Sequence, residues 1–312
     1  MKLSVIIPIY NNSQFFDRFL DCIIAQQVED CEFIVVDDGS KEDIYSELKK
    51  KIEKADDKRV RLIRLNKNLG YGAAVNYGID NSYGEYIGLY EPDDIIQKDF
   101  FSVLLEYANC NSIDIIKYNG LIKRKDNKDY KIFSYNKNYT NKIFNMHTYK
   151  RLGYSHPSIT NGIYRKEFLR KNWIKFCHGK GASYQDQQFR ISIWYANPRI
   201  LIIDDCKYIY CFHDNQSVSN HNDKIDNIIL NWKEEYSYLK LHYSGQLVFF
   251  IYSFYREIKG IKNKVSYENY IKLKSLYFEL YRSCRVDFIK AFSLRKNIIE
   301  FINFYLFTLR LM

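Results

Sequence analysis

The sequence predicts an α/β fold followed by a region made only of helices. In residues 1–100, apolar runs of strand length alternate with segments of helical periodicity, which is typical of a parallel sheet with helices on its faces. Residues 220–312 contain only helical patterns, rich in Tyr, Phe, Ile and Lys. We therefore expect one domain at 1–219, with halves at 1–100 and 101–219, and a helical region at 220–312.

The elements of the first half follow in a regular order. Strands are predicted at 3–9, 32–36, 60–65 and 86–90, and helices at 15–27, 44–55 and 73–79. The first apolar run follows Lys2, as in a signal peptide, but it contains Pro8 and no small-residue cleavage site follows it. It is better explained as a buried strand. No stretch of the sequence reaches the length of a membrane span.

The remaining elements have weaker patterns. Strands are predicted at 114–119, 121–124 and 207–212, and helices at 187–194, 227–243, 246–261, 268–284 and 290–312. The segment 123–142 is rich in Lys, Asn and Tyr and shows no periodicity. It is predicted to be a polar loop, either a mobile lid or a solvated insertion.

Composition limits the classes of function. The net charge of +10 indicates an anionic partner, such as nucleic acid, a phosphorylated substrate or an acidic membrane surface. The cysteines are seven in number and form no C-x-x-C pair. This usage is typical of a reduced, cytosolic protein with structural thiols and argues against a zinc site.

An acidic turn follows the strand at 86–90. Pro92 prevents the strand from continuing, so Glu91, Asp93 and Asp94 are left at the edge of the sheet where ligands bind in open α/β folds. Packed carboxylates repel one another unless a cation lies among them, and hard oxygens suit Mg²⁺ or Mn²⁺ with a phosphate-bearing ligand. The alternative is a solvated acidic turn.

Asp38 ends the second strand at the same sheet edge. A carboxylate there can accept hydrogen bonds from a base or a ribose. The alternative is that Asp38 caps the helix at 44–55. A dinucleotide site is not supported, because no G-x-G-x-x-G follows the first strand, and the sequence contains no P-loop.

Four segments in this order resemble family 2 glycosyltransferases of the GT-A fold: Val5-Ile-Ile-Pro-Ile-Tyr-Asn11, Val35-Val-Asp-Asp-Gly-Ser40, Asn68-Leu-Gly-x-x-x-Ala-x-Asn76-x-Gly78 and the acidic turn. Two shorter segments, at 160–169 and 184–189, resemble the family's W-N-K-L-Y-R-R-E-F-L and G-E-D-x-x-F segments. The resemblance implies a Rossmann-like mixed sheet flanked by helices, with 1–100 as the nucleotide-sugar half and 101–219 as the acceptor half.

The resemblance also implies roles for single residues. Tyr10 would stack on the donor base, Asp38 would hydrogen-bond to that base and Asp93 would lie near the ribose. Asp94 would hold Mn²⁺ or Mg²⁺. Glu91 stands where the family usually has Asp, and as the longer side chain it could bridge to the metal through water. Four further matched residues complete the donor-binding set: Pro8, Asn68, Gly70 and Asn76.

Asp186 matches the family's catalytic base. It would take the proton from the acceptor hydroxyl, which attacks the anomeric carbon from the face opposite the leaving diphosphate. The alternative is that Asp186 caps the helix at 187–194. His213 precedes a segment that resembles the family's S-x-S segment, which contacts the diphosphate. It is a candidate third metal ligand or phosphate donor.

The implied function is inverting transfer of a sugar from a nucleotide-sugar, with UDP as the first choice. The implied acceptor is a bacterial glycan: lipopolysaccharide, capsule or lipid-linked oligosaccharide. Two alternatives stay open, a nucleotidyltransferase and a non-catalytic membrane or scaffold module on the same fold. A nucleotidyltransferase would normally carry a Gly-rich phosphate loop after the first strand, which is absent.

The C-terminal segment combines a basic cluster at 282–296 with an apolar stretch at 298–311. That order suits an interfacial helix on an anionic membrane. Packing on the catalytic domain or on a second subunit are the alternatives. No nucleic-acid motif is present, so we expect no nucleic-acid partner. The expected location is cytoplasmic, with peripheral contact at the inner face of the membrane.

Overall fold

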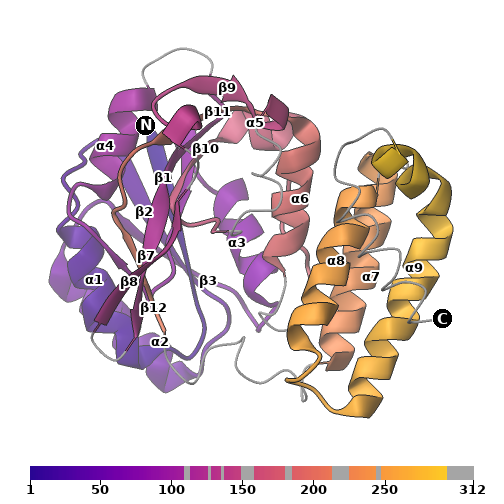
Figure 1. The fold of residues 1–312 in the computed structure, drawn as a ribbon. Coiled ribbons are helices and arrows are strands. Elements are labelled where there is room, and N and C mark those ends of the chain that lie inside the picture. The colour runs from indigo at the N-terminus through magenta and orange to yellow at the C-terminus, as the bar shows by residue number, and fades with distance from the viewer. Residues whose placement is uncertain are drawn as a thin grey trace. The chain divides into compact units, whose positions relative to one another are not determined.

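The computed structural model describes residues 1–108, 113–125, 128–134, 137–148, 158–179, 185–212, 225–243 and 247–293. The chain divides into two compact units, Met1–Gln216 and Ser217–Met312 (Figure 1). The first unit contains a mixed sheet with helices on its faces, and the described part of the second unit consists of helices. The predicted α/β class with a mixed, helix-flanked sheet is confirmed.

The large sheet has eight strands in the order β3-β2-β1-β4-β10-β6-β11-β9. The strands β1 to β4 run parallel, and β10 is antiparallel to both of its neighbours, β4 and β6. The bounds are β1 Leu3–Ile9, β2 Cys31–Asp37, β3 Val60–Arg64, β4 Tyr86–Leu89, β6 Ile115–Tyr118, β9 Ile143–Asn145, β10 Gly162–Arg165 and β11 Arg199–Ile203. The parallel half brings the carboxyl ends of β1, β2 and β4 to one edge.

The central strands are largely apolar, as expected for strands whose two faces are both covered. Every residue of β2 is buried, and so is every residue of β1 except Pro8, which is partly buried. Pro8 lies beyond Ile6, the last residue of β1 that pairs with β4. The missing N–H of Pro8 therefore removes no hydrogen bond between β1 and β4.

Helices cover both faces of the large sheet. Phe16, Leu48 and Phe100 bring α1 (Phe16–Ile24), α2 (Glu42–Ala55) and α4 (Phe100–Ala108) into one core with the strands. The helix α3 (Tyr71–Asp80) packs against Ile6 and Val36, where a Cβ added to Gly78 would lie 2.5 Å from the Ile6 side chain. Two further helices, α5 (Lys166–Lys171) and α6 (Asp186–Ala196), belong to the second half.

A second sheet, in the order β5-β12-β7-β8, lies beside the acidic turn. Its strands are β5 Ile95–Ile96, β7 Gly120–Lys125, β8 Lys128–Ser134 and β12 Tyr208–Cys211. The predicted polar loop at 123–142 is wrong, because β7 and β8 form an antiparallel hairpin. The Arg124 guanidinium pairs across the strands with both oxygens of Asp129, at 2.7 and 2.9 Å. Cross-strand pairing of this kind stabilises a polar strand that has no apolar alternation.

The second unit contains α7 (Ile225–His242), α8 (Val248–Ile261) and α9 (Tyr267–Ser293). The predicted break between helices at 285–289 is wrong, since α9 runs through it without Gly or Pro to end the helix. Residues 294–312, which include most of the last predicted helix, lie outside the described residues. Among the described helices, none has the length and apolarity needed to cross a membrane.

Candidate active site

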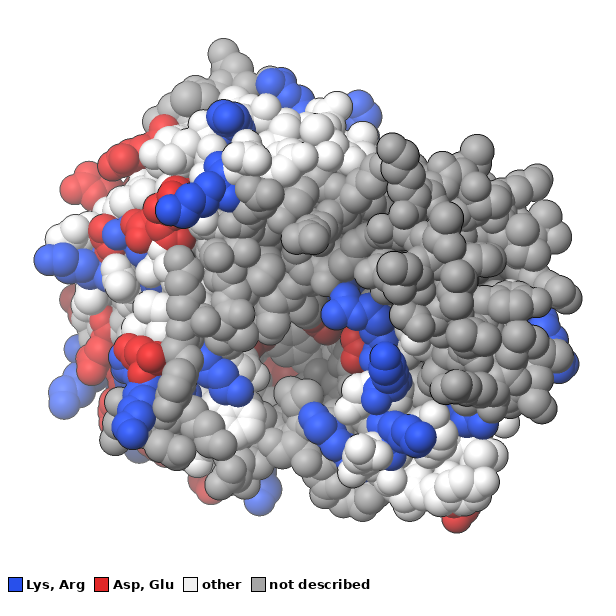
Figure 2. Space-filling model, in the orientation of Figure 1, with Lys and Arg blue, Asp and Glu red and all other residues white. Residues whose placement is uncertain are grey.

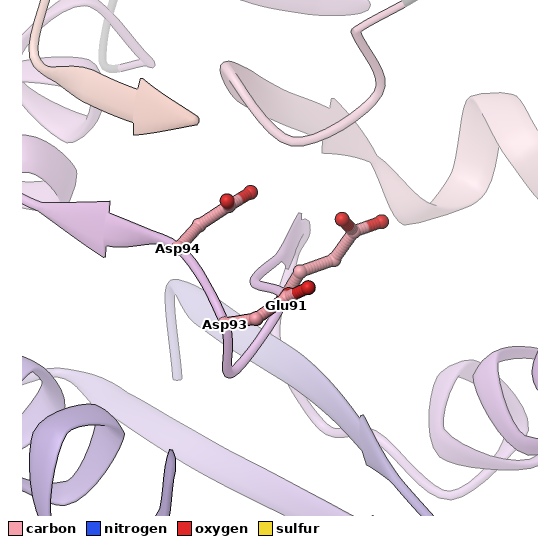
Figure 3. A group of neighbouring side chains, drawn as sticks. All are labelled: Glu91, Asp93 and Asp94. Atoms are coloured by element: carbon pink, nitrogen blue, oxygen red, sulfur yellow. The ribbon is translucent and has the colours of Figure 1, made fainter. Parts of the chain in front are cut away.

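The acids after β4 form a tight turn. The N–H of Asp94 donates to the Glu91 carbonyl at 3.0 Å, with Pro92 between them. One ligand oxygen each from Glu91, Asp93 and Asp94 lies within 4.8 Å of the other two. The three side chains leave the turn on the same side (Figure 3). The structure thus brings together the three predicted acids, which we call the acidic cluster.

The acidic cluster is held from behind by its neighbours. The Asp94 carboxylate accepts one hydrogen bond from the Tyr208 hydroxyl and another from the Cys211 N–H at 2.9 Å, and both donors belong to β12. The guanidinium of Arg18 in α1 donates to the Asp93 carbonyl. The two donors of β12 therefore hold the carboxylate of Asp94, which is 1% exposed, against the second sheet.

The electrostatics of the cluster favour a cation. Burial, together with Asp93 and Asp186, raises the pKa of Glu91 above its ordinary value. Burial and the other two acids of the cluster likewise raise the pKa of Asp94. These shifts mean that the ionised carboxylates repel one another unless positive charge compensates them. Hard oxygen ligands at this spacing fit Mg²⁺ or Mn²⁺.

Asp38 holds a loop at the same sheet edge. Its two carboxylate oxygens accept the N–H groups of Leu69 and Gly70, both at 2.8 Å. The capping alternative is wrong, because the N-cap of α2 is Lys41 and no side chain caps that helix. Gly39 next to Asp38 has φ +69°, and a Cβ there would lie 2.5 Å from the backbone of residue 67, so the two loops are in close contact.

Tyr10 and Asn68 lie open at this edge. Tyr10 follows β1 directly and is 46% exposed. The neighbouring Asn11 fixes the local path, because its N–H donates to Ser40 Oγ at 2.9 Å. Asn68 is exposed, beside the loop that Asp38 holds. An exposed aromatic ring next to an anchored carboxylate is an arrangement on which a flat heterocycle can stack.

Asn76 has a different environment from the other predicted donor residues. Its amide nitrogen donates to the Phe176 carbonyl, and its amide oxygen accepts the Phe176 N–H, both at 3.0 Å. These bonds fix the orientation of the amide, so its nitrogen is also the donor to His178 Nε2 at 2.9 Å. Asn76 therefore joins α3 to the segment at 174–179.

Asp186 is the first residue of α6, and Gln185 before it connects the helix to α3. The fully buried Gln185 side chain accepts the Gly72 N–H at 2.6 Å and donates to the Gly179 carbonyl. A Cβ at Gly72 would lie 2.0 Å from the Cys177 carbonyl oxygen, so only glycine allows this contact. Burial raises the pKa of Asp186, and Arg190 one turn later opposes that shift.

Tyr71 contacts the acidic cluster. Its hydroxyl donates to Glu91 Oε1 at 3.2 Å. Burial, followed by the charges of Glu91 and Asp186, raises the pKa of Tyr71. Sequence reasoning missed Tyr71, Gln185 and Arg18. Tyr71 and Gln185 carried a signal, since each is the immediate neighbour of a motif residue, whereas Arg18 stands inside an ordinary amphipathic helix.

Two predicted features receive no structural account. His213 and the Ser217–Ser219 segment lie outside the described residues.

On the described surface facing the viewer in Figure 2, acidic and basic side chains lie next to one another over the first unit. On that face, the basic side chains that contribute to the net charge of +10 are therefore interspersed with acidic side chains.

Two bacterial proteins are similar to this chain in sequence. The uncharacterized glycosyltransferase EpsJ of Bacillus subtilis is 27% identical over 215 residues, covering 67% of this chain and 60% of EpsJ. The uncharacterized glycosyltransferase YibD of Escherichia coli is 27% identical over 240 residues, covering 75% of this chain and 68% of YibD. The alignment thus spans less than two thirds of EpsJ.

Two solved structures have the same fold. S. aureus TarS 1-349, in complex with UDP-GlcNAc, aligns with a TM-score of 0.66 and 20% identity, covering 90% of this chain and 81% of TarS. The mannosyltransferase PcManGT of Pyrobaculum calidifontis, in complex with GDP-Man and Mn²⁺, aligns with a TM-score of 0.54 and 16% identity, covering 74% of this chain and 63% of PcManGT.

The family comparison covers the edge formed by β1, β2 and β4 with its loops, but it ends before α6 and β12. The sequence profile of Glycosyl transferase family 2 matches residues 4–173, more than half of the 312 residues. The match includes the acidic cluster, Asp38 and the first turn of α3. This chain belongs to glycosyl transferase family 2 and has the GT-A fold.

Proposed function

We propose that the protein is a metal-dependent, inverting glycosyltransferase that uses a nucleotide-sugar, with UDP as the carrier. The observation that carries this proposal is the position of Glu91. It shares a site with Asp93 and Asp94, and it is also close enough to Asp186 for that charge to raise its pKa. An acidic cluster and a single carboxylate at one sheet edge are the two groups that such a transfer needs.

The acidic cluster is the proposed metal site. Asp94 and Glu91 would hold Mn²⁺ or Mg²⁺, and Asp93 would lie toward the ribose. When bound, the metal would neutralise charge on the leaving diphosphate. His213 stays a predicted further ligand. The fit rests on three carboxylate oxygen donors at close spacing, one of them from the buried Asp94.

The carboxyl edge of β1 and β2 is the proposed donor site. Tyr10 has an exposed ring on which the base could stack, and Asp38 holds the loop that contains Asn68 and Gly70 through hydrogen bonds. UDP is preferred by the resemblance and by the fold shared with TarS, whose complex contains UDP-GlcNAc. PcManGT, with GDP-Man bound, makes GDP the carrier to test against UDP.

Asp186 is the proposed base. Burial raises its pKa, so the ionised side chain accepts a proton more readily than an ordinary Asp does. Gln185 fixes the start of α6 through Gly72 and Gly179, which holds the carboxylate in one place. A base held in line with the acceptor hydroxyl gains most of its effect from that positioning.

The acceptor proposed is a hydroxyl of a bacterial glycan at the cytoplasmic face of the membrane. This proposal rests on the family resemblance and on the basic and apolar order of residues 282–311. Membrane contact by that segment, or its use as a subunit interface, stays a prediction, because residues 294–312 lie outside the described part of the chain.

A panel of UDP-sugars and GDP-sugars with Mn²⁺ tests the proposal. Each is incubated with the protein, and free nucleoside diphosphate and pyrophosphate are both measured. Release of UDP from one UDP-sugar supports the proposal. Release of pyrophosphate indicates a nucleotidyltransferase instead. Absence of both products with every donor, while the protein remains folded, favours the non-catalytic alternative.

A further inference from the structure

Glu91 differs from the other two acids of the cluster in its freedom of movement. A Glu side chain has one more rotatable bond than Asp, so fixing its carboxylate costs more conformational entropy. Asp94 is fixed by two donors from β12, and the backbone at Asp93 is held by Arg18. The Glu91 carboxylate accepts its hydrogen bond from the Tyr71 hydroxyl, at 3.2 Å.

The Tyr71 ring is itself held in place. It packs edge to face on Phe176, with ring centroids 6.0 Å apart. Phe176 is fully buried, stacks on Phe189 of α6 at 4.4 Å and is bonded through its backbone to Asn76. The hydroxyl of Tyr71 is thus carried by a rigid support that spans α3 and α6.

We propose that Tyr71 is a positioning residue for the metal site, whose hydroxyl orients the Glu91 carboxylate toward the ion. This inference rests on the proposed function, since it assumes that the acidic cluster binds a divalent cation. Hydrogen-bonded partners of metal ligands fix the ligand's direction, and losing one typically costs about 10–100-fold in metal affinity.

The direction of this hydrogen bond agrees with the role. The Tyr71 hydroxyl donates to Glu91 Oε1 at 3.2 Å, so it holds the Glu91 carboxylate on the α3 side of the turn.

The test is Mn²⁺ binding, measured by electron paramagnetic resonance with Mn²⁺ alone. Tyr71→Phe keeps the ring and its packing on Phe176 and removes only the hydroxyl, so we expect Mn²⁺ affinity to fall by about tenfold. The spectrum of the bound ion should also change, because one ligand is no longer oriented. Tyr77→Phe is the matched control, since Tyr77 is on the same helix and 43% exposed, and it should bind Mn²⁺ as the wild type does.

A double-mutant cycle separates orientation of Glu91 from packing. In Glu91→Asp the carboxylate is one methylene shorter and is drawn away from the Tyr71 hydroxyl. Adding Tyr71→Phe to that variant should then change Mn²⁺ affinity by less than about twofold, within the range of uncoupled sites. A full tenfold loss in both backgrounds would assign the effect to packing and overturn the inference.

Two further results would overturn either the role of Tyr71 or the metal site itself. Wild-type affinity and spectrum in Tyr71→Phe, with binding lost in Asp94→Asn, would overturn the role of Tyr71 while leaving the metal site in place. Absence of Mn²⁺ binding by the wild-type protein would instead overturn the metal site, and the inference with it.

Discussion

The acidic turn after β4 and the start of α6 both carry carboxylates of the proposed site, but their surroundings differ. At the turn, Asp94 is bonded to β12 and lies in a group of three acids, and its burial together with the charges of Glu91 and Asp93 raises its pKa. At α6, Asp186 stands as a single acid, and Arg190 opposes the rise of its pKa. We propose that the first surrounding suits a bound cation, and that the second, where burial raises the pKa of Asp186, suits a proton acceptor.

This difference is the reason that we propose different tasks for the acidic cluster and for Asp186. In the proposed mechanism, a divalent ion would relieve the repulsion within the acidic cluster. Asp186 already has the cationic Arg190 one turn later, and its carboxylate would accept the proton. The two regions are joined through the first turn of α3, where Tyr71 contacts Glu91 and Gly72 contacts Gln185.

The largest effect is expected at Asp94. Asp94→Asn keeps the shape of the side chain but removes its charge from the acidic cluster. Mn²⁺-dependent UDP binding should fall by more than the roughly 10–100-fold typical of an outer-shell partner, because Asp94 is proposed as a direct ligand. Calorimetry of UDP with and without Mn²⁺ measures this loss.

Asp99→Asn is the matched control for Asp94. Asp99 lies close by in the sequence but pairs with Lys207 at 2.7 Å, outside the cluster. Its substitution should leave Mn²⁺-dependent UDP binding unchanged. Equal losses in both variants, or unchanged binding in Asp94→Asn, would contradict the metal assignment.

The next effect is expected at Asp186. Asp186→Asn should reduce turnover by at least ~10²-fold, the lower end for general-base catalysis, while Mn²⁺ and UDP still bind. Steady-state kinetics and calorimetry on the same preparation separate the two quantities. Loss of donor binding together with turnover would place Asp186 in the donor site instead.

A helix-start control accompanies the Asp186 variant. Asp43 lies in the first turn of α2, so Asp43→Asn removes a comparable favourable charge from a helix N-terminus. Only Asp186→Asn should reduce turnover. Near-normal turnover in Asp186→Asn would assign that residue to stabilising α6.

A smaller effect is expected at Gln185. Gln185→Glu keeps the shape, but a carboxylate cannot donate to the Gly179 carbonyl and places a charge in a fully buried position. We expect kcat to fall by about tenfold, because a displaced start of α6 takes Asp186 out of line with the acceptor hydroxyl, while KM for the donor changes little.

Gln188→Glu is the control for Gln185. Gln188 is also buried on α6 and donates to the Lys175 carbonyl at 3.2 Å, but it makes no bond to α3. It should lower thermal stability to a similar degree with a smaller loss of kcat. Equal losses of kcat would show that general destabilisation of α6, and not its link to α3, limits the reaction.

The sequence alone determined the order of the elements in residues 1–90 and the edge at which the acids lie. The runs at 3–9 and 32–36 could be identified as strands because continuous apolar stretches of that length suit buried parallel strands. Pro92 fixed the place where the fourth strand ends, and Glu91, Asp93 and Asp94 followed directly from it. These features are local, so a few neighbouring residues specify them.

Tertiary structure alone decided which distant groups support those acids. Tyr208 and Asp94 are separated by 114 residues, Gln185 and Gly72 by 113, and Phe176 and Asn76 by 100. The hairpin of β7 and β8 likewise depends on pairing that its polar composition hides. Such contacts leave no local pattern, because a side chain's partner is set by the folded path of the whole chain, which brings α3, α6 and β12 to the edge that the sequence had marked with acids.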